Sequence, residues 1–472
     1  MTFLHKKLLL LAILLSLVMV LLPSTPPGVQ AKAQTQELPV YVVQEGDTLG
    51  TIALRFGVTV DEIISVNPIA DPNALNIGQR LNIPGLEGVT GVLASETLLF
   101  GSSLTGLTRQ YQIDTSGLAY LNRITSPSEV IAGLSYIIPV NEESSPLLPV
   151  VSVTTDTTLL EEAIKKSTSP WIIMADNRIK ASWDIIPGEA LYGRSDTEIE
   201  QSPFPGIESI SFNNLPIIQG ETLQVEISTS SAVEITGSFD GETLHFFSED
   251  NGTYYSFHGI HALAEPGSYP LELRITNEGG NEYRFAQNVL LIEGGYGNEW
   301  VNVPEEYLDE SVIAEEDAYL QPILEQATPE RFWDGQFRYP VDEPCINSVF
   351  GQRRDYNNGG LYFYHTGLDF AVCAQNLNIY APARGRVVLA EELTIKGKAV
   401  LLDHGWGVFS GYWHLSEFNV SVGDVVQPGD IIGQIGDTGR SAGPHLHFEM
   451  DITGTPVNPE TWLNQVFILP AP

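Results

Sequence analysis

A block of sequence occurs twice in this chain of 472 residues, and this repeat restricts the possible folds more than any other feature. Residues 101–139 align with residues 46–84 at an offset of 55 positions and without a gap. The two copies share a set of identical residues at equivalent positions (Gly46/Gly101, Leu49/Leu104, Asn67/Asn122, Pro72/Pro127, Gly78/Gly133, Ile83/Ile138 and Pro84/Pro139). A recurrent period of this size indicates a small module that is used twice.

Each copy carries the pattern of a β-α-α-β unit. In the first copy, Tyr41–Val43 favours a short strand, and the N-cap residues Asp47 and Thr48 precede apolar residues at helical spacing. A second helix begins at Thr59, and Pro84 ends the last strand. We therefore expect two small α+β (βααβ) modules, one over residues 40–85 and a more diverged one over residues 95–140.

The first copy resembles the LysM module, which binds N-acetylglucosamine polymers such as the glycan strands of peptidoglycan. The matching residues are Gly46-Asp47-Thr48-Leu49, Ile52-Ala53, Asn67-Pro68 and the closing residues 78–84. The resemblance implies sugar contacts in the loops around Gly46–Thr48 and Asn67–Asn73, with Gly46, Asp47, Thr48 and Asn67 as candidates, although most of these residues also build the fold. The second copy has Ser102-Ser103 in place of Asp47-Thr48, which leaves its sugar binding open.

The first 33 residues have the order of a secretory signal peptide. His5, Lys6 and Lys7 precede an apolar run over residues 8–22, and the small-x-small triplet Ala31-Lys32-Ala33 follows. The apolar run is short against the ~20 residues that span a bilayer. We expect export and cleavage rather than a permanent anchor, no stable membrane span afterwards, and a mature protein that is secreted or lies in the cell wall or envelope.

The charge balance excludes some partners. Asp and Glu number 59 against 23 Lys and Arg, which gives a formal net charge of −36. Nucleic-acid binding needs clustered cations, so we expect no nucleic-acid partner. The same charge weighs against electrostatic docking on an anionic membrane.

The middle of the chain separates into three segments. Residues 141–200, rich in Glu, Ser, Thr and Pro, predict a linker with leading strands. Short β-rich runs with turn signals such as Asp240-Gly241 predict an immunoglobulin-like β-sandwich over residues 201–295. Residues 296–334 predict an acidic linker, although their aromatic residues leave open a segment that packs over the next domain and restrains it.

Five of the nine histidines lie beyond residue 364 (His365, His404, His414, His445 and His447), in sequence rich in β-formers and glycine turns. Because residues i, i+2 and i+4 share one face of a strand, His365 and Asp369 can point into one cleft, as can His445 and His447. Two imidazoles and a carboxylate leave a fourth position for water, which is typical of a catalytic site with one Zn²⁺ per chain. The residues alone leave open that His404 and His414 are packing histidines.

The ordered motifs FGQRR (350–354), HTGLD (365–369), YWHLS (412–416) and GRSAGPHLHFE (439–449) resemble the lysostaphin-type (LytM-like) zinc metallopeptidases. These are mainly antiparallel β enzymes that cut peptidoglycan cross-bridges or stem peptides. The resemblance implies a peptidase domain over residues 335–472 and a zinc site formed by His365, Asp369 and His447.

The same resemblance implies roles for other residues. His445 would be the general base for the attacking water, and His414 would hold the oxyanion. Arg353 or Arg354, together with Ser441 and Gly443, would shape the cleft. Trp413 stands where the family usually has a small residue, which would narrow a subsite.

The two cysteines, Cys345 and Cys373, lie close together in the chain. In an exported protein such a pair predicts a disulfide, whereas inside the cell metal binding or free thiols are favoured. Together, these features predict a secreted peptidoglycan endopeptidase that LysM modules target to the wall. The alternative is a non-catalytic wall-binding activator or scaffold for another murein hydrolase, which the complete ligand set disfavours.

Overall fold

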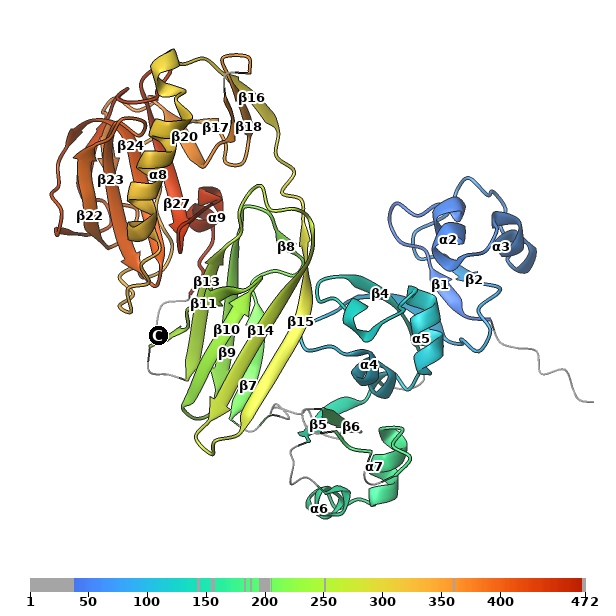
Figure 1. The fold of residues 1–472 in the computed structure, drawn as a ribbon. Coiled ribbons are helices and arrows are strands. Elements are labelled where there is room, and N and C mark those ends of the chain that lie inside the picture. Colours follow the sequence, from blue (N-terminus) through green and yellow to red (C-terminus); the bar gives the residue numbers. More distant parts are fainter. Residues whose placement is uncertain are drawn as a thin grey trace, which may run out of the picture.

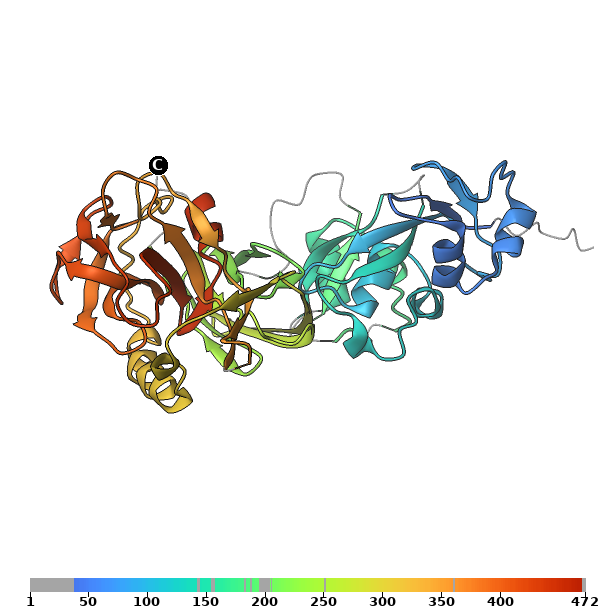
Figure 2. The same cartoon turned by 90° about the horizontal axis from the view of Figure 1, so that it is seen from above.

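The computed structural model describes residues 38–468 apart from 142–144, 154–157, 182–183, 187–188, 195–203, 205, 250–251 and 360. The predicted signal peptide lies outside the described residues. Figure 1 shows small N-terminal modules on one side of a β-rich middle domain and a larger β domain on the other side. Seen from above, the modules and the C-terminal domain lie at opposite ends of an elongated molecule (Figure 2). No helix in the described part of the chain is long and apolar enough to cross a membrane.

The two repeated blocks each fold as a unit with two strands and two helices. Their elements are β1 (Val40–Val42), α2 (Leu49–Phe56), α3 (Val60–Val66) and β2 (Arg80–Asn82), then β3 (Val92–Thr97), α4 (Leu104–Gln110), α5 (Thr115–Asn122), η1 (Pro127–Glu129) and β4 (Ser135–Val140). Thr48 and Thr59 cap the first two helices through capping boxes. Strand β1 pairs with both β2 and β3, so the two units share one sheet in the order β2-β1-β3-β4.

A third β-α-α-β unit follows where the sequence predicts a linker. It consists of β5 (Leu148–Ser152), α6 (Leu159–Lys165), α7 (Pro170–Asp176) and β6 (Ala190–Gly193), around a small core that includes Leu159, Ala163 and Ile173. Its helices are capped by Thr158 and Ser169. These positions lie 55 residues after the caps Ser103 and Asp114 of the second unit.

In each of the three units, an asparagine at the equivalent position links a helix to a strand by hydrogen bonds. Asn67 donates to the carbonyls of Ile63 and Asn82, and its own carbonyl accepts from the N–H of Asn82. Asn122 and Asn177 make the same three bonds at successive offsets of 55 residues. Residues 148–193 are therefore a third copy of the unit, and the linker prediction for residues 141–200 is wrong over this range. At the offset of 55 the third copy keeps Leu159, the tripeptide Asn177-Arg178-Ile179 and Gly188, a set of identities that the linker prediction overlooked because the rest of the segment has diverged.

The middle domain consists of two sheets. Their strands are β7 (Ile207–Phe212), β8 (Ile217–Ile218), β9 (Thr222–Thr229), β10 (Val233–Phe239), β11 (Glu242–Leu244), β12 (Phe247–Ser248), β13 (Thr253–Gly259), β14 (Gly267–Asn277) and β15 (Glu282–Ile292). The orders are β11-β10-β14-β15-β8 and β12-β13-β9-β7. Alternate residues of β9 and β14, such as Val225 and Leu273, meet in one core between the sheets. We call this domain the sandwich.

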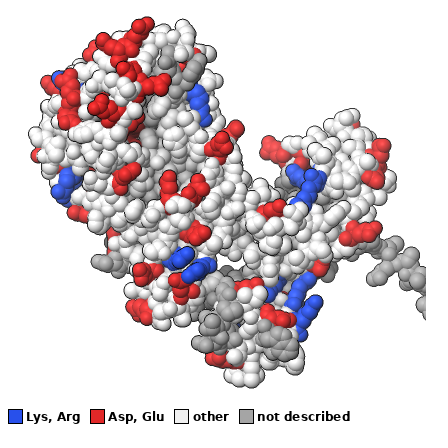
Figure 3. Space-filling view, viewed as in Figure 1, with Lys and Arg blue, Asp and Glu red and all other residues white. Residues whose placement is uncertain are grey.

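The acidic segment after the sandwich is folded and packed, so the prediction of a linker over residues 296–334 is wrong. It forms β16 (Asn298–Val301), η2 (Glu305–Tyr307) and α8 (Glu310–Leu324). Leu320 and Leu324 of α8 pack against the C-terminal sheet in one cluster with Trp413. The buried carboxylate of Glu316 accepts from the backbone N–H groups of Ile395 and Lys396, which lie in a turn between two strands of that sheet. The acidic side chains on the exposed surface mask this apolar face in the sequence, and Figure 3 shows how strongly Asp and Glu outnumber Lys and Arg over this end of the molecule.

The C-terminal domain is built on a large, mainly antiparallel sheet. Its elements are β17 (Ile346–Ser348), β18 (Arg353–Tyr356), β19 (Leu361–Tyr364), β20 (Gly367–Ala371), β21 (Asn378–Tyr380), β22 (Gly385–Glu392), β23 (Lys398–Gly405), β24 (Val408–Phe418), β25 (Val425–Val426), β26 (Ile431–Ile435), β27 (His445–Ile452), β28 (Thr455–Val457) and α9 (Pro459–Asn464). The central order is β17-β20-β27-β24-β23-β22-β25. Leu368, Leu446 and Phe448 lie on the face that packs into the main core, which leaves the alternate residues for the opposite face.

Several contacts join the sandwich to this domain. Phe257 and Ala262 of the sandwich belong to the main core of the C-terminal domain. Trp462 of α9 donates its indole N–H to Thr222 of the sandwich. Strand β16 of the acidic segment also pairs in parallel with β18. Within the C-terminal domain, Cys345 and Cys373 form a disulfide.

Candidate metal centre

Two neighbouring strands bring the candidate ligands together. Strands β20 and β27 are antiparallel, and Asp369 and His447 are direct partners in their register. Both side chains lie on the face opposite the main core, because Leu368 and Phe448 point into it. His365 precedes β20 by two residues and reaches the same point.

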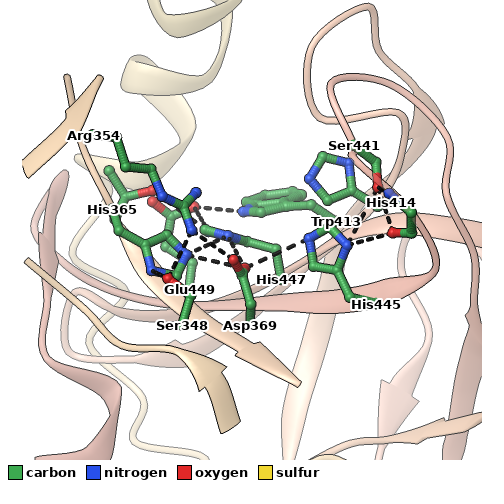
Figure 4. Close-up of polar contacts among 12 residues, drawn as sticks. Ser348, Arg354, His365, Asp369, Trp413, His414, Ser441, His445, His447 and Glu449 are labelled. Carbon is green, nitrogen blue, oxygen red and sulfur yellow. Dashed lines mark hydrogen bonds and ion pairs between the residues drawn. The ribbon is translucent and has the colours of Figure 1, made fainter. Parts of the chain in front are cut away.

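Three side-chain atoms converge closely at this point (Figure 4). His365 Nε2 lies 3.0 Å from Asp369 Oδ1 and 3.1 Å from His447 Nδ1. The distance from His447 Nδ1 to Asp369 Oδ1 is 2.9 Å. All three residues are buried. Among the residues that the structure describes, His365, Asp369 and His447 are the cluster of His, Cys, Asp and Glu side chains whose ligand atoms lie close enough to hold a metal ion.

Neighbouring groups orient each of these side chains. The Nδ1–H of His365 donates to the carbonyl of Val349 (2.8 Å), so in the neutral ring it is the Nε2 without a proton that faces the centre. Arg354 donates to Asp369 Oδ2 (2.6 Å), so the other carboxylate oxygen is the one that faces the centre. Glu299, on β16 of the acidic segment, accepts from Arg354 in turn (2.8 Å).

The protonation states suit metal binding. Burial alone would raise the pKa of Asp369, but the imidazoles of His365 and His447 hold it well below its usual range. Burial is the main reason why the pKa of His447 is lowered to about 3. Near neutral pH the site therefore offers an ionised carboxylate and a neutral His447, which are the forms that bind metals.

Two further histidines face the same centre. His445 Nδ1 donates to the carbonyl of Gly443 (2.8 Å), and its Nε2 lies 3.6 Å from Asp369 Oδ1. Ser441 closes this loop by donating to the same carbonyl (2.7 Å). The sequence-predicted residues Ser441, Gly443 and His445 thus lie together beside the ligands.

His414 enters from β24, with its ring 4.9 Å from that of His445. Its Nδ1 donates to the carbonyl of Thr438 (2.7 Å), so a neutral ring carries no proton on Nε2. Burial, followed by the nearby His445 and His447, holds the pKa of His414 well below its usual range. The predicted oxyanion role would need a second proton on this ring, which its surroundings oppose.

Trp413 occupies a different place from the predicted subsite. Its side chain is buried beneath α8 in a cluster with Leu320 and Leu324, and its indole N–H donates to Glu449 (2.5 Å). Glu449 lies two residues after His447 on the same face, with its carboxylate 3.9 Å from His447 Nε2. Helix α8 therefore covers the part of the sheet face next to the candidate ligands. Trp413 contacts both sides, because it packs against α8 and donates to Glu449 beside His447.

Arg353 is placed differently from the prediction. Its guanidinium donates to the carbonyl of Ala262 in the sandwich (3.2 Å), and it is the adjacent Arg354 that contacts Asp369. Successive residues of a strand point to opposite faces, so the change from 353 to 354 reverses the direction of the side chain. Of the two arginines in the predicted pair, Arg354 therefore contacts the candidate ligands, and the assignment of Arg353 to the cleft is corrected.

The predicted sugar-binding residues of the first unit are used mostly by its own fold. Asp47 accepts from the Tyr41 hydroxyl and from the Gln44 N–H, both at 2.7 Å, and Thr48 caps α2. The amide of Asn67 is buried and fully engaged, which contradicts its assignment as a sugar contact. Gly46 lies in an exposed loop with open space around it.

Sequence reasoning missed several residues of the site, namely Ser348, Glu299 and Glu449. Glu449 could have been found, since it continues the i, i+2 series of His445 and His447 along β27. Ser348 and Glu299 carry no such signal, because they reach Arg354 only through the tertiary fold.

Two segments of the chain match known protein families. Residues 363–459 match the sequence profile of peptidase family M23, and residues 41–84 match that of the LysM domain. The chain is similar to the DD-carboxypeptidase/endopeptidase Mpg of Neisseria meningitidis serogroup B, with 44% identity over 120 residues, 25% of this chain and 27% of that protein. It is also similar to the peptidoglycan DD-endopeptidase ShyA of Vibrio cholerae, with 38% identity over 122 residues, 26% of this chain and 28% of that protein.

Among solved structures, the catalytic domain of the antimicrobial peptidase lysostaphin from Staphylococcus simulans matches with 29% identity and a TM-score of 0.21. That match covers 31% of this chain and 98% of that domain. The chain covers less than a third of the length of the two curated relatives.

Proposed function

We propose that this chain, whose residues 363–459 form an M23 peptidase domain and whose residues 41–84 form a LysM domain, is an exported endopeptidase that hydrolyses peptide bonds of peptidoglycan. The convergence of His365 Nε2, Asp369 Oδ1 and His447 Nδ1 on one point carries this proposal. The curated relatives named as peptidoglycan endopeptidases support the choice of substrate.

The three donor atoms fit a zinc ion. Ligand atoms around tetrahedral Zn²⁺, bound at ~2.0–2.2 Å, lie roughly 3.3 Å apart. The observed separations of 2.9–3.1 Å need to widen by only a few tenths of an ångström. Two nitrogens and one oxygen also match the donor set of catalytic zinc sites. When bound here, Zn²⁺ supplies a Lewis acid that polarises a peptide carbonyl and makes water more acidic.

The chain's own residues supply the proton transfers. The carbonyl of Gly443 holds the Nδ1–H of His445, so in the neutral ring the Nε2 that faces the centre carries no proton. This nitrogen is placed to accept a proton from the attacking water and to pass it to the leaving amine. The Nε2 of His414 lies beside it, but the surroundings of this ring oppose a second proton, so the proton transfer is assigned to His445.

Arg354 and Glu299 position the carboxylate. Without its partner, Asp369 could turn and offer either oxygen, and metal affinity would fall. Because Glu299 lies on β16, the acidic segment contributes directly to the order of the site. This favours a supporting role for the segment over the restraint that its composition suggested.

The function is tested with residues 34–472 and intact peptidoglycan, with and without a chelator and with zinc added back. New amino groups are expected, new reducing ends are not, and chelation should stop the release until zinc is restored. His404→Gln is a matched control, since it removes a histidine of the same sheet that lies away from the centre. Release of reducing ends, or no release while the protein still pellets with the wall, would contradict a peptidase and favour a glycan hydrolase or a non-catalytic binding role.

A further inference from the structure

The first two repeated units use the same edge in opposite ways. In the first unit, the loops at residues 44–46 and 76–78 are exposed, and the side chain of Ile77 is 71% exposed. A Cβ added at Gly46 or Gly78 would meet no atom within 4 Å. This edge of the first unit is therefore open to a ligand.

In the second unit, one loop of the equivalent edge, around Ala132, is buried against the sandwich, while the loop at 101–103 stays largely exposed but is bound by it. Ala132, which corresponds to Ile77, is 0% exposed and belongs to the sandwich core. Its N–H donates to the carbonyl of Asn288, and its own carbonyl accepts from the N–H of Leu290, both at 2.9 Å. Ala132 thus forms a parallel bridge with Val289 of β15.

The second loop of this edge is bound by one side chain of β15. Gln287 accepts from the N–H of Gly101 (2.6 Å) and donates to the carbonyls of Ser102 and Val130, both at 3.0 Å. Gly101 and Ser102 are the counterparts of Gly46 and Asp47 in the first unit. The loop atoms that are free in the first unit are therefore occupied in the second.

The sequence differences between the copies explain the docking. Phe100 stands where the first unit has the exposed Glu45, and its ring packs against Phe212 of the sandwich at 5.2 Å. Alanine at 132 in place of isoleucine lets the backbone reach β15. A Cβ at Gly133 would lie 2.9 Å from the Cα of Pro216, whereas its counterpart Gly78 has open space.

The contact of Ala132 with β15 also covers an exposed edge of the sandwich. Strand β15 is covered on its outer side by β8 only at Leu291 and Ile292. Ala132 pairs with the next stretch of this edge, which would otherwise offer free backbone groups to other chains.

We propose that the second unit is an adapter: its edge is a permanent intramolecular dock for β15, so that of the first two units only the first is free to bind a wall glycan. This inference rests on the proposed function for the choice of glycan, but not for the dock itself. Because both units belong to the sheet β2-β1-β3-β4, fixing the second unit on the sandwich also fixes the first unit relative to it.

Hydrogen exchange of the full chain tests the proposal, with and without a soluble oligomer of N-acetylglucosamine as the probe. In the free protein, amides at 99–103 and 130–133 should exchange about 10²-fold more slowly than those at 44–48 and 76–78. Addition of the oligomer should slow exchange only at 44–48 and 76–78. Fast exchange at 130–133 in the free protein would overturn the dock, and oligomer-dependent slowing there would overturn the adapter role.

Gln287→Ala provides the matched variant, because it removes the three bonds to the dock and lies far from the metal centre. Exchange at 99–103 should rise at least about 10-fold, while wall hydrolysis stays unchanged. An unchanged exchange rate in this variant would contradict the assigned contact. Absence of oligomer-dependent slowing at 44–48 and 76–78 would overturn glycan binding by the first unit, and the hydrolysis assay reports separately on the peptidase.

Discussion

His404 and His445 lie on the same sheet and are both bonded through Nδ1 to a backbone carbonyl, but only one of them has a free second nitrogen. His404 Nδ1 donates to Arg384 O (2.8 Å), and its Nε2 accepts from the hydroxyl of Ser410 (2.7 Å). The Nε2 of His445 instead faces the converging ligands. The difference teaches that a histidine in this domain is recognised as functional by the unpaired nitrogen it presents and not by its burial.

The largest effect is expected from removing a ligand. Asp369→Ala deletes one of the three donor atoms, so zinc content should fall from about one per chain to near zero and hydrolysis should be undetectable. Metal analysis and the amino-group assay measure both effects. Zinc content equal to that of the unchanged protein would remove Asp369 from the ligand set.

A smaller loss is expected from His445→Ala, which removes the free nitrogen but none of the ligands. Hydrolysis should fall about 10²–10⁴-fold, as is typical when a general base is lost, while zinc content stays near one per chain. The combination of these two readouts separates this residue from Asp369. Full activity in the variant would assign the proton transfer to His414.

Arg354→Gln tests the group that orients Asp369. Zinc affinity should fall about 10–100-fold, because outer partners of metal ligands typically contribute that much. A competition titration with a chelator measures the affinity, and excess zinc should restore hydrolysis. A loss of activity that excess zinc does not restore would mean that Arg354 acts on the substrate and not through Asp369.

The smallest effect concerns His404, whose pKa burial lowers to about 4. The unfolded chain takes up a proton near pH 6.5, so the stability of the neutral, buried form is complete above that pH and is lost as the pH falls toward 4. At pH 5 the loss is about 2 kcal/mol. His404→Gln should remove this loss and leave hydrolysis at neutral pH intact.

Hydrogen exchange of strand β23, measured at pH 7 and pH 5 in both proteins, gives the local stability that this comparison needs. Equal losses in the two proteins would show that His404 does not titrate in this range. A fall in hydrolysis at neutral pH would place His404 with the functional histidines.

The alternation of side chains along a strand was enough to predict much of the site from the sequence. The spacing of His445 and His447 places both on one face of β27, and β20 brings Asp369 beside them. His365 precedes β20, so its approach to the same point is set by the tertiary fold. The alternation of side chains along a strand predicts a face only when one residue of the strand is already placed. The sequence motif did not show which of Arg353 and Arg354 points toward the site. Only the pairing of β18 with its neighbours decides which of the two faces Asp369.

The segments outside the motifs were harder to predict, for two physical reasons. In residues 296–334 the acidic surface of α8 dominates the composition, while the few apolar residues that dock it, such as Leu320 and Leu324, do not stand out. In residues 148–193 the unit is held by Asn177 and two helix caps, so most other positions are free to vary. Both segments are determined by contacts rather than by composition.

The disulfide between Cys345 and Cys373 closes a loop of chain that contains both His365 and Asp369. Closure of such a loop removes about 3.6 kcal/mol of chain entropy from the unfolded state. Two of the three metal donors are thus ordered partly by an oxidation reaction. For the proposed peptidase, loss of this bond would therefore lower the stability of the part of the chain that carries His365 and Asp369, so the candidate metal site would depend on the oxidation of two thiols that lie outside it.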